Sequence, residues 1–383
     1  MFLCACPFLW YLEHSHFFFE GYLQNIPKFA GNPMEANYKK YLLHFKRPSG
    51  TSRGVLHQKE TWFLSLKGPK GFGIGECGIL RGLSPEDGSD YEGKLQWTCD
   101  NIHMGPEALW TALEDFPSIQ FGVEQAFMSY SAANHLEPFP SEFTTASSPI
   151  NINGLIWMGD EAFMLKQLEE KLQDGFTCIK MKIGAIDFQS EIAILASLRK
   201  RYDKDALELR VDANGAFSTK DAMEKLRILA AYGLHSIEQP IPPGNPLKMA
   251  ELCKSTPIPI ALDEELIGIV KMAEKECLLE QLRPQFIILK PSLIGGFKGA
   301  SQWIGLAEKY GIGWWITSAL ESNVGLNAIA QWTATLNNPL PQGLGTGSLY
   351  TNNIDSPLQV LGGQLYYRTD KMWDRQKLQG ICL

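Results

Sequence analysis

From about residue 148 onward, short apolar or alternating runs take turns with segments that have helical spacing. A short apolar or alternating run bounded by turn residues is typical of a strand. The strands predicted in this way span residues 150–157, 177–183, 207–213, 235–239, 258–264, 285–290 and 313–319, with a last short strand near 342–346. Strict alternation of strand and helix predicts parallel strands joined by right-handed crossovers.

Two of the intervening segments illustrate the helical pattern. Residues 187–202 place their apolar side chains on one side, which is the spacing of a helix laid on a sheet. Residues 218–233 begin with Ser218 as the predicted N-cap, carry Asp221 three residues later, and stop at Gly233. Eight predicted strands, with no GxGxxG turn after the first, favour a closed (β/α)₈ barrel over an open doubly wound sheet.

The region before the barrel has a different texture. Residues 34–147 are predicted to form an α+β domain, with hairpin strands in the Gly-rich segment 66–80 and a helix in 106–116. Residues 1–33 are expected to be a poorly structured extension that reflects the choice of start site, with a peripheral membrane anchor as the alternative. Their apolar run is too short to span a bilayer, and the first basic residue is Lys28, which argues against a secretory signal.

One ionisable residue falls at the carboxyl end of each of five consecutive predicted strands. These residues are Lys182, Asp212, Glu238, Asp263 and Lys290, at spacings of 30, 26, 25 and 27 residues. In a parallel barrel all these strand ends open at the same rim, where barrel enzymes keep their active sites. We therefore expect the five side chains to converge.

The residue types at this rim are chemically compatible. Any one of the three carboxylates alone would be interpreted as a solvated loop residue or a helix N-cap. Together they suit a hard divalent cation such as Mg²⁺, which prefers oxygen ligands. Lys180 and Lys182 point to the same face of their strand, and nearby positive charges would favour the neutral amine of Lys182 as a base, with Lys290 across the site. Such a site can abstract a proton α to a carboxylate while the metal stabilises the enediolate.

Composition narrows the partners. The chain of 383 residues has 35 basic and 42 acidic residues, a formal charge of −7 and no long basic cluster, which argues against a nucleic-acid or anionic-membrane partner. Its eight cysteines are scattered without a CxxC pair, which indicates free thiols of a reducing compartment and hence a cytoplasmic protein.

Five ordered motifs resemble those of the enolase superfamily, in the branch of the muconate-lactonising enzymes. They are KMK (180–182), VDANGAF (211–217), IEQP (237–240), ALDE (261–264) and ILKPSLIGG (288–296). The resemblance implies a modified, enolase-like (β/α)₈ TIM barrel at residues 148–354. It also implies an α+β capping domain built from 34–147 and the returning segment 355–383.

The resemblance also assigns roles to residues. Asp212, Glu238 and Asp263 would hold Mg²⁺, with Mn²⁺ as a possible substitute. Lys182 would be the general base, Lys290 its counterpart and Lys180 the residue that tunes its neighbour. Asn214 would support the site or contact the substrate, and Glu264 would support the site.

Further cues within the branch lie in PSGTSRGVL (48–56), SALESNVGLNAIAQ (318–331) and GLGTG (343–347). They resemble the dehydratases of menaquinone biosynthesis that convert 2-succinyl-6-hydroxy-2,4-cyclohexadiene-1-carboxylate to 2-succinylbenzoate. The substrate would be a small carboxylate. Ser318 and Glu321 would contact it, and Arg53 would pair with its second carboxylate or be an ordinary solvated turn residue.

Two other functions stay open. Lysines on both faces of a bound α-carbon also suit an N-acylamino-acid or dipeptide racemase. The dipeptide epimerases of this branch usually carry an acid-x-acid pair near the eighth strand, however, and the segment GLGTGSLY (343–350) has none. A non-catalytic barrel that only binds ligands is the second alternative, although no expected ligand or base is missing.

Overall fold

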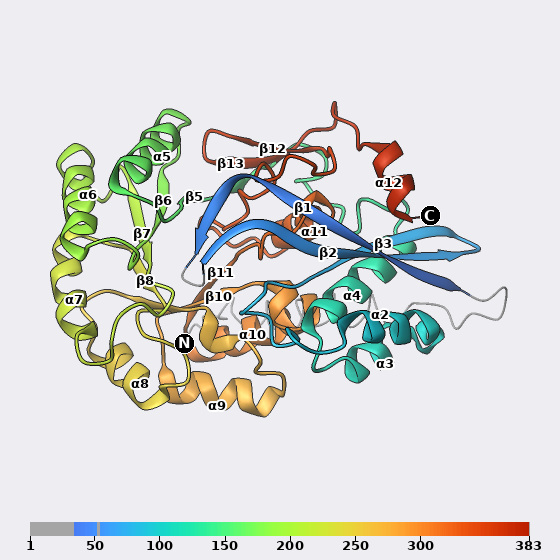
Figure 1. The fold of residues 1–383 in the computed structure, drawn as a ribbon, viewed down its shortest axis with the longest axis horizontal. Helices are drawn as coiled ribbons and strands as arrows, with labels where there is room; N and C mark the ends of the chain where they lie inside the picture. The colour runs from blue at the N-terminus through green and yellow to red at the C-terminus, as the bar shows by residue number, and fades with distance from the viewer. Residues whose placement is uncertain (1–33, 52–53, 383) are drawn as a thin grey trace, which may run out of the picture.

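The protein consists of a curled parallel sheet surrounded by helices and a second α+β part packed over one end of it (Figure 1). The computed structural model describes residues 34–51 and 54–382, so the extension predicted at residues 1–33 lies outside the described residues. Seven strands are hydrogen-bonded in the order β11-β10-β9-β8-β7-β6-β5. They are β5 (Gly154–Ile156), β6 (Cys178–Lys182), β7 (Glu208–Asp212), β8 (Ser236–Glu238), β9 (Ile260–Leu262), β10 (Phe286–Leu289) and β11 (Gly313–Ile316).

The gap between the first and last of these strands is closed by the segment that follows helix α11. Ile152 bridges to Gln342 and Thr317 bridges to Gly343, both in parallel orientation. The eighth strand predicted near 342–346 is therefore present only as these two single bridges. Together with the alternating helices, this closure confirms the prediction of a modified (β/α)₈ barrel with a capping domain.

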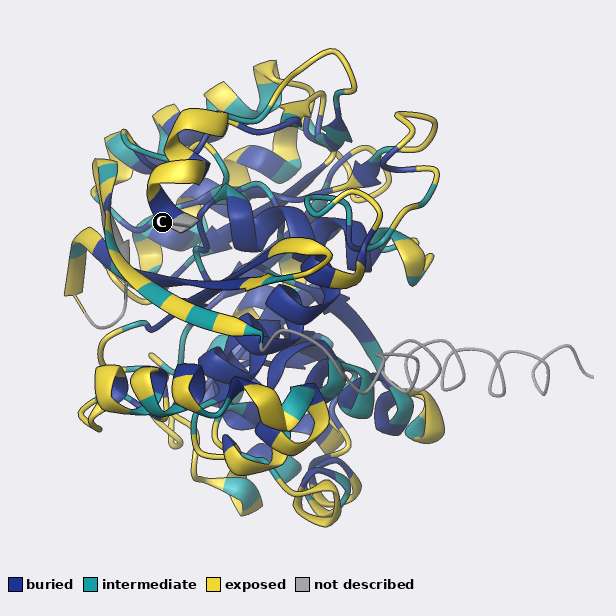
Figure 2. Ribbon diagram, turned by 90° about the vertical axis from the view of Figure 1, so that its right-hand side faces the viewer, coloured by how far each residue is buried: buried dark blue, intermediate teal, exposed yellow. Residues whose placement is uncertain are grey.

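Helices follow the strands and cover the outside of the sheet. They are α5 (Glu161–Gln173), α6 (Phe188–Arg201), α7 (Ala222–Leu229), α8 (Pro246–Ser255), α9 (Met272–Leu282), α10 (Gly296–Tyr310) and α11 (Asn323–Thr335), with short 3-10 turns η2 (Ala230–Tyr232), η3 (Glu264–Leu266) and η4 (Pro291–Leu293). Figure 2 shows buried residues in the interior of the molecule and exposed residues on the outer turns of the helices. The barrel core is therefore made where the apolar face of each helix meets the sheet.

The ends of α6 and α7 can be compared with the helix ends expected from the sequence. Asp187 caps α6, since its carboxylate accepts hydrogen bonds from the backbone N–H groups of Gln189 and Ser190. The regular helix begins later than predicted, because α7 starts at Ala222 and Asp221 occupies its N-cap position. The predicted contact of Ser218 with Asp221 is present, since the Ser218 hydroxyl accepts a hydrogen bond from the Asp221 N–H and donates one to the Asp221 carboxylate. The Ala222 N–H donates to the Ser218 carbonyl oxygen, so this turn leads directly into α7. The predicted stop at Gly233 is confirmed, since this glycine has a left-handed φ of 55°.

The capping part is an antiparallel sheet backed by helices. Its elements are β1 (Glu35–Thr51), β2 (Gly54–Gly68), β3 (Gly71–Gly78), α2 (Tyr91–Asp100), η1 (Ile102–Met104), α3 (Gly105–Ala112) and α4 (Pro117–Ser131). The predicted Gly-rich hairpin is β2–β3. A Cβ on Gly75 would come within 1.9 Å of the Gly122 carbonyl oxygen on α4, so the glycines of β3 are needed for the sheet to approach the helix.

The segment PSGTSRGVL (48–56) lies at the tip of the β1–β2 hairpin, and its residues 48–51 and 54–56 belong to these two strands. The end of the chain contacts both parts of the protein, since Leu365 and Tyr367 of the segment after the barrel pack in the barrel core and its last helix reaches the cap. After the barrel, β12 (Leu358–Leu361) and β13 (Gln364–Tyr367) form a small sheet with β4 (Ile150–Asn151). The last helix, α12 (Arg375–Cys382), packs against β1 and β2. None of the helices in residues 34–51 and 54–382 has the length and apolar character needed to cross a bilayer.

Two buried glutamates of the cap join it to the barrel. Glu76 on β3 accepts hydrogen bonds from the N–H groups of Ser322 and Gly325, each at 2.8 Å, at the start of α11. Glu124 on α4 accepts from the N–H groups of Phe297 and Lys298, at 2.6 and 3.2 Å, in the first turn of α10. Free N–H groups at a helix N-terminus attract a negative charge. In a barrel these N-termini lie on the side of the strand carboxyl ends, so the two contacts place the cap over the mouth.

Burial also affects the chemistry of one of these groups. Loss of hydration raises the pKa of the Glu124 carboxyl to about 8, even though two backbone N–H groups stabilise its charged form. The N-terminus of α10 therefore does not fully compensate for the removal of this carboxylate from water.

We expect Glu76→Ala to lower the free energy of unfolding by about 2–5 kcal/mol, because several buried donors lose their acceptor. The measurement is urea denaturation followed by circular dichroism. Glu251→Ala is the matched control, since this glutamate is exposed and its substitution should change the same quantity by less than about 0.5 kcal/mol. Equal effects of the two substitutions would contradict the proposed domain contact.

Candidate active site

The five ionisable residues predicted to share a rim do so. Lys182, Asp212 and Glu238 are the last residues of β6, β7 and β8, and the strand register pairs Lys182 with Asp212 and Asp212 with Glu238. Asp263 and Lys290 directly follow β9 and β10. The parallel register thus brings together side chains that are more than a hundred residues apart in sequence.

Ammonium and carboxylate groups alternate within this cluster. Lys180 and Lys182 both contact Oδ2 of Asp212, with their Nζ atoms at 3.1 and 3.3 Å. Lys180 also pairs with Glu238, and Lys290 pairs with Asp263. The prediction that the two lysines of β6 share one face is confirmed, because both reach the same oxygen atom.

The mutual charges shift the titration of the cluster. Burial would raise the pKa of the Asp212 carboxyl, but the ammonium groups of Lys180, Lys182 and Lys290 outweigh burial and hold this pKa well below its usual range. Burial would lower the pKa of Lys290, yet Asp263 and Glu238 raise it.

Two further members of the cluster are fully buried. Burial alone would lower the pKa of Lys180, but the charges of Asp212 and Glu238 outweigh it and raise that pKa. Burial, and secondly the charge of Asp212, raise the pKa of Glu238 well above its usual value. Burial and the neighbouring charge of Asp212 therefore outweigh the positive charge that Lys180 and Lys290 bring to Glu238.

The three carboxylates fit the donor set of a magnesium ion. All offer hard oxygen atoms, and Oε1 of the buried Glu238 accepts no hydrogen bond from a described residue, although Oε2 pairs with Lys180. No group of three or more His, Cys, Asp or Glu side chains within residues 34–51 and 54–382 is already arranged as a metal site. The ammonium groups of Lys180 and Lys290 neutralise these carboxylates instead.

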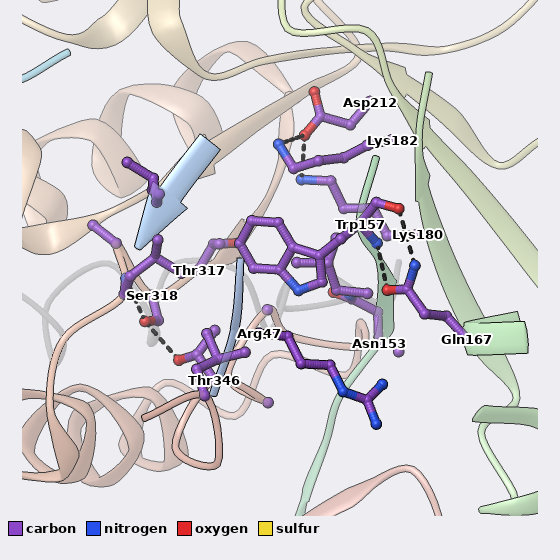
Figure 3. A pocket seen from close by; sticks show the side chains of 18 of the residues that line it. Arg47, Asn153, Trp157, Gln167, Lys180, Lys182, Asp212, Thr317, Ser318 and Thr346 are labelled. Carbon is purple, nitrogen blue, oxygen red and sulfur yellow. Dashed lines mark hydrogen bonds and ion pairs between the residues drawn. The ribbon is translucent and has the colours of Figure 1, made fainter. Parts of the chain in front are cut away.

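A cavity of about 660 Å³ opens above the cluster, and Figure 3 shows part of its wall. On one side it is lined by Lys180, Lys182, Asp212 and Lys290. The wall supplied by β5, β11 and the eighth segment is uncharged. Its residues include Asn153, Trp157, Thr317, Ser318 and Thr346. The cavity therefore has a charged side at the rim cluster and a neutral wall, while Lys46, Arg47 and Arg81 of the cap and Glu170 and Lys171 of α5 add charged groups elsewhere on its lining.

The residues predicted to contact a substrate have different positions. Asn214 and Ser318 line the cavity. Glu321 lies behind the wall, where it accepts hydrogen bonds from the hydroxyls of Ser292 and Ser318, so the structure gives it a supporting place instead of the predicted contact. Arg53 lies outside the described residues.

Asn214 links the base to the carboxylates. Its Oδ1 accepts a hydrogen bond from Lys182 at 2.7 Å, and its Nδ2 donates to Glu264 at 3.0 Å. Asn214 has a φ of 43°, a left-handed conformation that costs energy for a residue other than glycine. The sequence-based expectation that Asn214 and Glu264 support the site agrees with these contacts.

Sequence reasoning missed three of the residues that shape this site. The side chain of Gln239 is buried behind the rim and receives hydrogen bonds from the N–H groups that follow β9. Trp157 and Thr346 line the cavity. Gln239 lies inside a recognised motif and Trp157 is the last residue of a predicted strand, so position at a strand end was the signal available for both.

Comparisons with known proteins agree with this geometry. Residues 164–370 match the enolase C-terminal domain-like family. An o-succinylbenzoate synthase of Desulfotalea psychrophila is 46% identical, over 87% of this chain and 98% of the relative. An N-succinylamino acid racemase of Amycolatopsis is 25% identical, over 83% of this chain and 88% of the relative. The crystal structure of MenC from Desulfotalea psychrophila superimposes with a TM-score of 0.77 at 42% identity, over 87% of this chain and 99% of that chain. The protein therefore belongs to the enolase superfamily.

Proposed function

We propose that this protein is an o-succinylbenzoate synthase, a hydro-lyase that dehydrates 2-succinyl-6-hydroxy-2,4-cyclohexadiene-1-carboxylate to 2-succinylbenzoate in menaquinone biosynthesis. The observation that carries the proposal is that Lys182 and Lys290, from strands that are not neighbours, line one cavity beside a cluster of buried carboxylates. The 46% identity to an enzyme of this name supports the choice of reaction.

Lys182 is the base in this proposal. The C–H bond α to the ring carboxylate breaks, its proton passes to Nζ of Lys182, and the electron pair delocalises into the carboxylate as an enediolate. The C–O bond of the ring hydroxyl then breaks, and the leaving hydroxide takes that proton from Lys182 to form water. The electron pair completes the aromatic ring, which makes the step favourable.

The remaining lysines stabilise charge. Lys290 stays an ammonium because Asp263 and Glu238 raise its pKa, so it can face the negative charge that develops on the substrate. Lys180 cancels charge between Asp212 and Glu238. The Asn214 side chain holds the Lys182 amine at the cavity wall.

Enzymes of the enolase superfamily generally use Mg²⁺. In this chain Asp212, Glu238 and Asp263 would hold the ion, and Mn²⁺ would be able to replace it. When bound, the ion supplies electrostatic stabilisation of the enediolate.

Racemisation of N-succinylamino acids is a second candidate activity. It requires a base or acid on each face of the α-carbon, and Lys182 and Lys290 supply two amines from separate strands. The N-succinylamino acid racemase among the relatives supports this alternative.

We place the protein in the cytoplasm, since all five cysteines whose side chains are described are free thiols.

We expect Lys182→Ala to lower kcat for dehydration by roughly 10²- to 10⁴-fold, the usual contribution of a general base. The assay is the ultraviolet absorbance change on conversion of the cyclohexadiene substrate. Lys166→Ala is the control, because this exposed lysine lies on α5 away from the cavity. Near wild-type dehydration by a correctly folded Lys182→Ala variant would refute the assignment of the base.

We expect EDTA to abolish dehydration and Mg²⁺ or Mn²⁺ to restore it. Isothermal titration should show Mg²⁺ binding to the wild-type protein and binding weakened by roughly tenfold or more in Glu238→Gln, because a charged ligand is lost. Glu251→Gln should bind Mg²⁺ as the wild type does. Unaltered Mg²⁺ affinity in Glu238→Gln would show that the ion does not bind to this carboxylate.

A further inference from the structure

Trp157 occupies a position that the reaction mechanism does not use. It directly follows β5, whose register with β6 pairs Leu155 with Lys180 and Ile156 with Met181. Continuing this register by one residue places Trp157 beside Lys182. Directly paired residues of neighbouring strands point to the same face of the sheet. Trp157 therefore shares the inner face with the two lysines, and it lines the same cavity.

The indole forms a flat apolar surface in the neutral wall of the cavity. Figure 3 shows it projecting into the cavity near the β6 lysines, with Arg47 also nearby. Thr317 and Ser318, which line the same neutral wall, directly follow β11. A substrate whose carboxylate lies at the rim cluster would place other atoms against this wall, where Trp157 offers a large flat face.

A buried glutamine fixes the backbone that carries this wall. Gln167 on α5 accepts a hydrogen bond from the Trp157 N–H at 3.0 Å and donates to the Trp157 carbonyl oxygen at 3.1 Å. The side chain is only 8% exposed, so these bonds are protected from water. A two-point contact of one amide with one residue restrains both position and rotation, which suits a residue that must present a flat face.

We propose that Trp157 is a specificity-determining residue that packs against the ring of the substrate, and that Gln167 is its positioning residue. The inference rests on the proposed dehydration of a cyclohexadiene carboxylate. The product of that reaction is a planar benzoate, whose ring can lie against the indole over a large area. An acyclic N-succinylamino acid presents no ring there, so Trp157 favours the cyclic ligand.

The first test measures binding of 2-succinylbenzoate and of N-succinylvaline by isothermal titration, to the magnesium-loaded protein. Trp157→Ala should weaken binding of 2-succinylbenzoate by roughly 10- to 100-fold and binding of N-succinylvaline by at most a few-fold. Trp157→Phe should retain most of the preference. Trp97→Phe is the matched control, because this tryptophan belongs to cap helix α2 and should leave both affinities unchanged. Equal weakening of both ligands, or of neither, would overturn the proposal.

The second test concerns Gln167. Gln167→Met removes both hydrogen bonds at similar volume, and we expect KM for the cyclohexadiene substrate to rise several-fold while kcat changes little and the KM for N-succinylvaline in racemisation stays near the wild-type value. A purely structural role would lower Tm without changing the ratio of the two KM values, which would overturn the positioning role.

Failure of the proposed function would be visible separately. A wild-type protein that does not convert the cyclohexadiene substrate refutes the dehydratase assignment. The titrations with 2-succinylbenzoate and N-succinylvaline still decide whether Trp157 selects a planar ring.

Discussion

The site depends on a balance of charge inside a space that water barely reaches. Asp212, Glu238 and Asp263 are each at most 2% exposed, and an isolated carboxylate could not be buried to that extent without becoming protonated. Lys180 and Lys290 compensate for these charges, and removal of one partner of a buried ion pair typically costs about 3–5 kcal/mol. The residues proposed for catalysis are therefore also necessary for the stability of the barrel mouth, so their substitution requires a check of folding.

Buried groups that need a partner also hold the cap in place: backbone N–H donors at helix N-termini and the carboxylates that meet them. Barrel helices begin at the rim, so their unpaired N–H groups point toward the cap. Glu76 and Glu124 meet two of these helices, and each carboxylate satisfies at least two backbone donors. A cap held in this way cannot rotate over the mouth without exposing buried donors and buried carboxylates together. The position of the cap over the mouth is thus stabilised by contacts at the ends of two barrel helices.

The cluster of charged residues at the rim could be predicted from the sequence, whereas much of the neutral wall of the cavity could not. Parallel strands end at one edge, so the regular spacing from Lys182 to Lys290 was sufficient to predict that these side chains lie close together. Glu321 was predicted to touch substrate, but its place behind Ser318 depends on a hydroxyl from Ser292 that no local pattern reveals. Trp157 resembled one more apolar residue at a strand end, and only the register with β6 shows that it faces the cavity. The contact of Ser218 with Asp221 was predicted, whereas the start of regular helix only at Ala222 was not.

The backbone just after several strand ends adopts left-handed conformations. Asn214, Gln239 and Leu320, three residues that are not glycine, have φ values of 43°, 38° and 64°, and each lies shortly after a strand end. Left-handed backbone at such residues costs free energy, and it persists where surrounding contacts enforce it. Asn214 forms hydrogen bonds with Lys182 and Glu264, and the Leu320 carbonyl oxygen accepts a hydrogen bond from the hydroxyl of Tyr350. These turns reverse the chain immediately after the reactive side chains, which keeps those side chains at the mouth. Change of substrate is therefore expected to involve residues outside the strained turns, such as Trp157, whose replacement leaves the charge balance intact.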